Sequence, residues 1–219
     1  MNFPTIRLAI GLAAILIAAL PAVSPAAEVT VAVTSGGQAI DDAVVLLRQA
    51  GLDAAFEPTA VMDQKNHQFA PFVLPVATGT AVSFPNSDNI RHHVYSFSPA
   101  KRFELRLYSG TPSEPVIFDN NGIVTLGCNI HDWMLGFIYV TDAPRFGVTG
   151  TDGRVHFSDV LDAPVEITVW HPRMGTTTEA VTANGQSDSV IPVELELGPP
   201  TRREPPEDSH PSPFGRRNR

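Results

Sequence analysis

Apolar and polar residues alternate over short stretches along most of the chain, and turn residues separate these stretches. Alternation with a period of two is typical of β-strands that bury one face. The stretches with this pattern, or with runs of Val, Leu and aromatic residues, are Glu28–Val33, Ala43–Leu47, Ala60–Asp63, Phe69–Phe84, His92–Phe97, Phe103–Leu107, Val116–Phe118, Ile123–Leu126, Leu135–Val140, Val155–Phe157, Val165–Trp170 and Ser189–Leu197. No stretch has a convincing helical period, and only Gln49–Phe56 leaves a short helix open as an alternative to a loop. The pattern therefore predicts an all-β fold of the β-sandwich type.

The stretch Phe69–Phe84 holds two apolar runs, one on either side of Gly79. Two apolar runs joined by a short turn with glycine are typical of a β-hairpin, so we expect these runs to pair with each other. Pro71 and Pro75 lie in the first run, and proline has no N–H to donate to a neighbouring strand. We therefore expect this run to lie at the edge of its sheet.

Two adjacent histidines open the stretch His92–Phe97. Because successive side chains of a strand point to opposite faces, His92 and His93 must lie on different sides of the sheet. The residues that follow place apolar side chains on both faces, so the alternation does not decide which face is buried. The sequence therefore leaves open which of the two histidines points inward.

The two ends of the chain depart from the strand pattern. Met1–Ala27 reads as a secretory signal peptide, because Arg7 precedes an apolar run, Leu8–Leu20, that is too short to span a bilayer. We therefore expect export to the periplasm and no stable membrane insertion after cleavage; an uncleaved membrane anchor is the alternative. Residues 199–219 are rich in Pro and Arg and poor in apolar residues, which predicts a disordered tail.

The net charge bears on the kind of partner, and the single cysteine bears on the chemistry of the chain. The formal net charge is −8, which argues against nucleic acid as a partner because phosphate binding needs a basic face. Cys128 is the only cysteine, so an internal disulfide is impossible. In an exported protein such a cysteine indicates either pairing between molecules or a thiol with a special role. Metal coordination is such a role, because the metal holds the sulfur as a thiolate.

Cys128 belongs to a short run of possible metal ligands, since His131 and Met134 follow it at intervals of three residues. A thiolate, an imidazole and a thioether together suit copper, and a blue-copper site combines one Cys and two His with a weak axial Met. The second imidazole has to come from the upstream strand, from His92 or His93. The alternative is that Cys128 is a small buried hydrophobe and Met134 fills the core.

The spacing of these residues resembles that of the cupredoxins, the blue copper proteins. The matching pattern is Asn86-x5-His92, followed by Gly122-x5-Cys128-x2-His131-x2-Met134. The interval between the last two residues is similar to that of amicyanin, whereas plastocyanins usually have a longer one. The resemblance covers roughly Glu57–Asp142, and the whole arrangement is also similar to bacterial proteins described as methylamine-utilisation-like.

The resemblance implies one type 1 copper ion with His92, Cys128 and His131 as equatorial ligands and Met134 as the axial ligand. His93 stands where the family usually has Asn, so the choice between His92 and His93 stays open. Trp133, Met134, Leu135 and Phe137 are candidates for the apolar cover of the ion. The remaining histidines, which are His67, His156, His171 and His210, are expected to be structural or exposed.

A family member of this kind carries single electrons and is not an enzyme. The resemblance implies redox partners such as a c-type cytochrome or a dehydrogenase, and the acidic chain would steer a basic partner. Two alternatives remain at this point. One is a periplasmic copper carrier or chaperone, and the other is a structural β-sandwich with a vestigial site.

The flanks of the copper motif resemble the two halves of a carboxypeptidase regulatory-like module. The first half is the GQAIDDAVVLL segment, and the second is TGTDGRVHFSDV with the PVEITVWHP segment. We therefore expect a discontinuous immunoglobulin- or transthyretin-like β-sandwich formed by residues 28–56 and 143–198. A Greek-key cupredoxin β-sandwich at residues 57–142 would be inserted between the halves, which is permissible where strand ends lie close together.

Overall fold

The computed structural model describes residues 27–54, 56–112, 114–184 and 189–199. The fold is all-β, as the alternation predicts, and the described residues contain a single short 3-10 helix, Pro172–Met174. Gln49–Phe56 forms no helix where it is described. No described helix is long and apolar enough to cross a membrane. The predicted signal peptide and the predicted tail fall outside the described residues, apart from Ala27, which begins the first strand, and Pro199.

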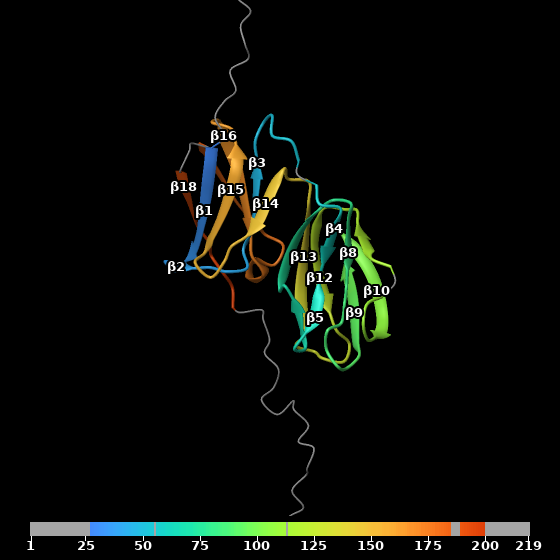
Figure 1. Cartoon of the computed structure of the whole chain (residues 1–219). Helices are drawn as coiled ribbons and strands as arrows, with labels where there is room; N and C mark the ends of the chain where they lie inside the picture. The colour runs from blue at the N-terminus through green and yellow to red at the C-terminus, as the bar shows by residue number, and fades with distance from the viewer. Residues whose placement is uncertain (1–26, 55, 113, 185–188, 200–219) are drawn as a thin grey trace, which may run out of the picture.

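Strands from the beginning and the end of the described chain form the first pair of sheets (Figure 1). One sheet has the order β15-β1-β18, with β2 paired to β1, and the other has the order β14-β3-β16-β17. The bounds are β1 Ala27–Ser35, β2 Gln38–Ala39, β3 Val44–Arg48, β14 Arg145–Val148, β15 Arg154–Val160, β16 Pro164–Trp170, β17 Glu179–Asn184 and β18 Ser189–Glu194. Alternate residues of β1, Val29, Val31 and Val33, are fully buried in a cluster with apolar residues of β3, β15, β16 and β18.

Strands from the middle of the chain form the second group of sheets, coloured from cyan to yellow-green in Figure 1. The larger sheet has the order β10-β9-β12-β13-β7, the smaller has the order β11-β8-β4, and β5 pairs with β6. The bounds are β4 Thr59–Val61, β5 Asp63–Lys65, β6 Gln68–Ala70, β7 Val73–Ala77, β8 Thr80–Ser83, β9 His92–Ser98, β10 Lys101–Tyr108, β11 Val116–Phe118, β12 Gly122–Gly127 and β13 Leu135–Thr141. A second buried cluster, which includes Phe84, Phe118 and Ile138, lies among these strands.

The predicted hairpin within Phe69–Phe84 is wrong. β7 pairs in parallel with β13, whereas β8 pairs with β11 and β4, so the two strands lie in different sheets. Gly79, with a φ of +92°, lies at the corner between them. Each strand pairs with segments elsewhere in the chain, and these pairings prevail over the local one. β7 does lie at the edge of its sheet, as Pro71 and Pro75 predict.

The chain passes between the two groups of sheets where β3 ends and β14 begins. β14 pairs directly with β3, and Arg145 lies opposite Leu47, so the point of departure and the point of return are neighbours. An ion pair between Arg48 and Asp142 lies at the same place. This geometry allows ninety-odd residues to leave and return without disturbing the sheet that contains β3.

A third apolar cluster joins the two groups of sheets. The Trp170 side chain at the end of β16 is 1% exposed, and its ring lies 5.6 Å from that of Phe137 and 5.5 Å from that of Tyr139, both on β13. Val44 and Leu46 of β3 are buried in the same cluster. β3 therefore buries both of its faces, which accounts for its uninterrupted apolar sequence.

We expect Trp170→Ala to lower the free energy of unfolding by about 3–5 kcal/mol, because it removes a large buried ring and leaves a cavity between the sheets. Urea unfolding of the purified protein measures this effect. Phe97→Ala is the matched control, since the Phe97 side chain is 74% exposed and its loss should change stability by no more than about 0.5 kcal/mol. Equal effects of the two substitutions would contradict a buried, stabilising position of Trp170 between the two groups of sheets.

Candidate metal centre

The Cys-His-Met run lies at one end of the larger middle sheet, between two neighbouring strands. Cys128 follows β12 directly, and Met134 immediately precedes β13. The loop between them turns tightly, since the Met134 N–H donates to the His131 carbonyl oxygen at 2.9 Å. β9 begins at the same end of the sheet, because Tyr95 of β9 lies opposite Gly127 of β12. Antiparallel pairing thus brings an upstream histidine to the loop.

Gly127 makes this close pairing possible. A Cβ atom at this position would lie 2.7 Å from the Tyr95 ring, which is closer than real Cβ contacts. The absence of a side chain lets the Tyr95 ring pack against the backbone just before Cys128. We infer that this residue helps to hold the loop that carries Cys128 against β9.

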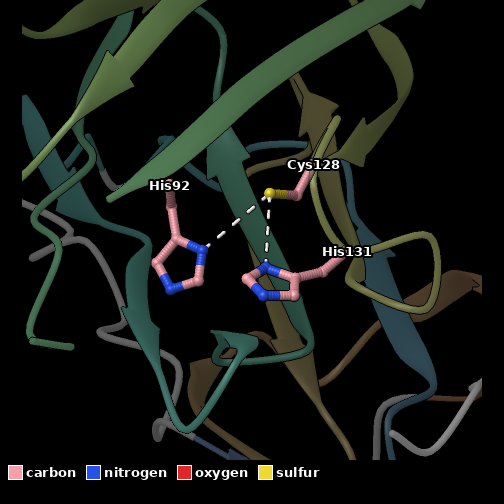
Figure 2. A group of neighbouring side chains, drawn as sticks. All are labelled: His92, Cys128 and His131. Atoms are coloured by element: carbon pink, nitrogen blue, oxygen red, sulfur yellow. Dashed lines mark hydrogen bonds between the residues drawn. The ribbon is translucent and has the colours of Figure 1, made fainter. Parts of the chain in front are cut away.

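The structure brings His92, Cys128 and His131 together (Figure 2). Cys128 Sγ lies 3.9 Å from His92 Nδ1 and 3.9 Å from His131 Nδ1, and the three candidate ligand atoms all lie within 4.8 Å of one another. Metal ions such as zinc hold imidazole nitrogen at roughly 2.0 Å and thiolate sulfur at roughly 2.3 Å, so two such ligands at a trigonal angle lie about 3.7 Å apart. The observed separations therefore fit three side chains that would hold a single ion.

The two adjacent histidines of β9 have different environments. His92 is fully buried and directs Nδ1 at the Cys128 sulfur. The His93 side chain lies on the opposite face, where its Nε2 forms a hydrogen bond of 3.0 Å with Glu104 of β10. The structure thus places His92, and not His93, beside Cys128. The buried face of β9 is the one that carries His92, Val94 and Ser96.

Asp88 holds the His92 ring from the side away from the sulfur. Its Oδ2 lies 2.7 Å from His92 Nε2, and its two oxygens also accept the backbone N–H groups of Asn66 and His67. Burial alone raises the pKa of Asp88, but the hydrogen bonds from His67, His92 and Asn66 outweigh it and keep the pKa below its ordinary value of 3.8. The tautomer that donates Nε2–H to this carboxylate has its Nδ1 lone pair directed toward the sulfur, as in carboxylate–histidine–metal arrangements.

His131 is the partly exposed member of the three. Burial and the neighbouring His92 and His67 imidazoles lower its pKa below the ordinary value of 6.5. A neutral imidazole is the form that binds a metal ion. The donor set therefore fits copper in both its chemistry and its geometry, because one cysteine sulfur and two imidazole nitrogens lie together.

Comparison with known proteins gives structural neighbours only. No protein-family model and no curated protein matches the chain. A purple cupredoxin from Nitrosopumilus maritimus is 20% identical with a TM-score of 0.33, over 39% of this chain and 100% of that chain. A mutant form of amicyanin in the reduced state is 17% identical with a TM-score of 0.35, over 44% of this chain and 98% of that chain. The similar structures are cupredoxins.

A copper-containing nitrite reductase from Thermus scotoductus SA-01 is also similar to this chain. The two are 23% identical with a TM-score of 0.36, over 42% of this chain and 24% of the reductase chain. The grouping of two histidines and one cysteine that the cupredoxin resemblance implies is present in this chain. Each of these matches spans less than half of the chain.

Met134, the axial ligand implied by the cupredoxin resemblance, is 2% exposed and belongs to the same buried cluster as Cys128. Trp133 covers His131, with ring centres 5.1 Å apart. Phe137, in contrast, packs against Trp170 and Phe72 in the joint between the sheets. The prediction that Phe137 covers the ion is therefore wrong. Its side chain lies in the cluster with Trp170, and not in the cluster that contains Cys128 and Met134.

His67 and Asp88 are residues of this region that sequence reasoning missed. The His67 ring centre lies 5.0 Å from that of His131 and 5.9 Å from that of His92. His67 comes from the turn between β5 and β6, and Asp88 from the loop before β9. Neither belongs to the cupredoxin spacing pattern, and a signal for either would have required knowledge of how these loops approach one another.

Two of the other histidines are structural, as expected. His171 is 7% exposed, and its Nδ1 accepts the Arg173 N–H at 3.1 Å. Burial, with the nearby Arg173 charge, lowers the His171 pKa to about 4. His156 Nδ1 lies 2.8 Å from the Thr30 hydroxyl on the neighbouring strand. His210 falls outside the described residues.

We expect Asp88→Asn to weaken copper binding by about 10- to 100-fold, because the carboxylate no longer fixes the orientation of the His92 ring. Competition with a copper chelator of known affinity measures the change. Asp119→Asn is the control, since Asp119 is exposed and pairs with Lys101 away from the three ligands. An unchanged affinity in Asp88→Asn would show that His92 is positioned without its partner.

Proposed function

We propose that this chain is a periplasmic cupredoxin with one type 1 copper ion, and that it carries single electrons between redox partners. The observation that carries the proposal is the convergence of His92 Nδ1 and His131 Nδ1 on the Cys128 sulfur, each at 3.9 Å. The cupredoxin spacing of the sequence and the predicted signal peptide support the same conclusion. The four proposed ligands are His92, Cys128, His131 and Met134.

The protein contributes ligands that resist movement. A bound copper ion would supply the one-electron couple. Cys128 and Met134 are buried in the core of the middle sheets, and His92 is locked by Asp88. Ligands held in this way stay in nearly the same places in both oxidation states, which keeps the cost of reorganisation low. Met134 and the apolar side chains around Cys128 would tune the potential of a bound ion.

The surroundings of His131 favour this end of the molecule for electron exchange. His131 is the one proposed equatorial ligand that is partly exposed, and Ile130 beside it is 50% exposed. A redox partner such as a c-type cytochrome or a dehydrogenase could approach here. Because the chain has a net charge of −8, a basic partner would associate faster, and salt would slow the association.

We further propose that the copper-binding sandwich, residues 57–142, is inserted into a carboxypeptidase regulatory-like module made of residues 28–56 and 143–198. The direct pairing of β3 with β14 and β16 supports this division. So does the separation of the two buried clusters, one drawn from the flanks and the other from the middle of the chain. The flanking module would present the copper domain to its surroundings.

Repeated reduction and reoxidation of the copper-loaded protein tests the proposed function. An electron carrier should lose its colour with ascorbate, regain it with ferricyanide, and keep one copper ion per chain through every cycle. Retention of copper only in the colourless reduced state, with release on oxidation, would instead indicate a copper carrier. Absence of copper binding altogether would indicate a structural β-sandwich.

A further inference from the structure

His67 lies at the tip of the β5–β6 hairpin, directly beside the three converging ligands. Asn66 and His67 both have positive φ angles, 55° and 58°, and Lys65 pairs with Gln68, so the hairpin has a two-residue turn. The Asp88 carboxylate accepts the backbone N–H of each turn residue, at 2.8 and 3.0 Å. The carboxylate that fixes His92 therefore also fixes the turn that carries His67.

His131 lies at the same distance from two other imidazoles, those of His67 and His92. The ring centres of His67 and His131 lie 5.0 Å apart with an interplanar angle of 55°. Those of His92 and His131 also lie 5.0 Å apart, with an angle of 57°. In the pair formed by His92 and His131, both Nδ1 atoms lie 3.9 Å from the Cys128 sulfur, and the two rings are proposed to bind one ion. The first pair has the same spacing and nearly the same tilt, so its two rings are close enough for one ion to lie between them.

The two pairs differ in their access to solvent. His92 is fully buried, and the Cys128 and Met134 side chains are 3% and 2% exposed. His67 and His131 are both partly exposed. In the described part of the chain, the ring nitrogens of His67 form no hydrogen bond. An ion that arrives from solution therefore meets His67 and His131 before it reaches the buried ligands.

We propose that His67 and His131 form a capture site for Cu(I), from which the ion passes to the buried ligands. His131 takes part in both sites. In the transfer His67 gives up its bond to the ion, His92 and Cys128 each form one, and the Cys128 thiol proton leaves to water. The ion keeps its charge, so no oxidant or reductant is required. This inference rests on the proposed copper site and adds the route by which that site is filled.

His67 does not belong to the resident ligand set in this arrangement. The group of side chains whose ligand atoms all lie within 4.8 Å of one another contains His92, Cys128 and His131, without His67. Two ligands on opposite sides of one copper ion would be separated by about 4.3 Å at most, given the metal–ligand distances used above. Loss of His67 should therefore slow the filling of the site and leave the filled site as it is.

The rate of copper uptake tests this proposal. The copper-free full chain is mixed with Cu(I) held by a chromophoric chelator, and decay of the chelate colour gives the rate. His67→Asn is the preferred variant, because asparagine accepts the positive φ that this turn requires. His93→Asn is the control, since His93 is a partly buried imidazole on the other face of β9. Near-ultraviolet circular dichroism confirms that each variant is folded.

We expect His67→Asn to slow uptake by about tenfold or more, because a second tethered imidazole acts at a high effective concentration. The final copper content and the visible spectrum after oxidation should match those of the unaltered chain, and free imidazole should restore part of the rate. A rate within twofold of the unaltered chain, or a changed spectrum of the filled site, would overturn the capture role. If the unaltered chain takes up no copper, the proposed function itself fails, which is a separate and distinguishable result.

Discussion

Cys128→Ser should abolish the intense visible absorption of the oxidised, copper-loaded protein. The absorption arises from the bond between a thiolate and Cu(II), and Cys128 is the only cysteine of the chain, so no other side chain can supply the sulfur. Serine is close to cysteine in size, and the side chain is 3% exposed, so the fold should persist. A titration with Cu(II), followed in the visible range, provides the measurement.

The same substitution should remove the stabilisation that copper gives to the fold. A ligand at 100 times its dissociation constant stabilises the folded state by about 2.7 kcal/mol. We therefore expect copper to raise the midpoint of thermal unfolding of the unaltered chain and to have little effect on Cys128→Ser. Full visible absorption in the variant would contradict the assignment of Cys128 as the sulfur ligand.

His92→Ala should weaken copper binding by more than about 100-fold, since loss of a mere hydrogen-bond partner of a metal ligand already costs 10- to 100-fold. His92 is fully buried with Nδ1 toward the Cys128 sulfur, and alanine offers no ligand atom at that position. Equilibrium competition with a chelator measures the affinity in each oxidation state.

His93→Ala provides the control, because it removes the same type of side chain from the opposite face of the same strand. The two residues are neighbours on β9, and His93 bonds to Glu104 on the outer side. Its loss should leave copper affinity and the visible spectrum nearly unchanged. If His93→Ala lost copper while His92→Ala kept it, the orientation of β9 and the ligand assignment would both be wrong.

The strand content of the fold was predictable because it depends on local alternation, which single stretches of sequence display. Strand pairing was less predictable. Residues on either side of Gly79 look like a hairpin, yet β7 and β8 find their partners in β13 and in β4 and β11. These partners lie outside the local stretch, so a pattern read within that stretch does not reveal them.

The candidate metal centre also has a part that the sequence predicts and a part that depends on strand pairing. Cys128, His131 and Met134 are seven residues from end to end, so their proximity follows from the sequence itself. The choice between His92 and His93 needed the register of β9 against β12, which one pair of opposed residues, Tyr95 and Gly127, establishes.

Two further residues near the candidate centre lie outside any spacing pattern. His67 and Asp88 reach it from separate loops, and they are linked through a backbone N–H that only the folded chain brings to the carboxylate. No local pattern in the sequence could have placed them there, because their positions depend on how the β5–β6 turn and the loop before β9 pack together.

The most direct test of the account is a combined visible and electron paramagnetic resonance spectrum of the full chain after reconstitution with one equivalent of Cu(II). The account predicts one bound ion per chain, with intense thiolate-to-copper absorption and a single Cu(II) signal that disappears on reduction. A colourless protein whose Cu(II) signal resembles copper bound by nitrogen and oxygen alone would show that the Cys128 sulfur does not bind the metal, and the proposed redox role would be contradicted.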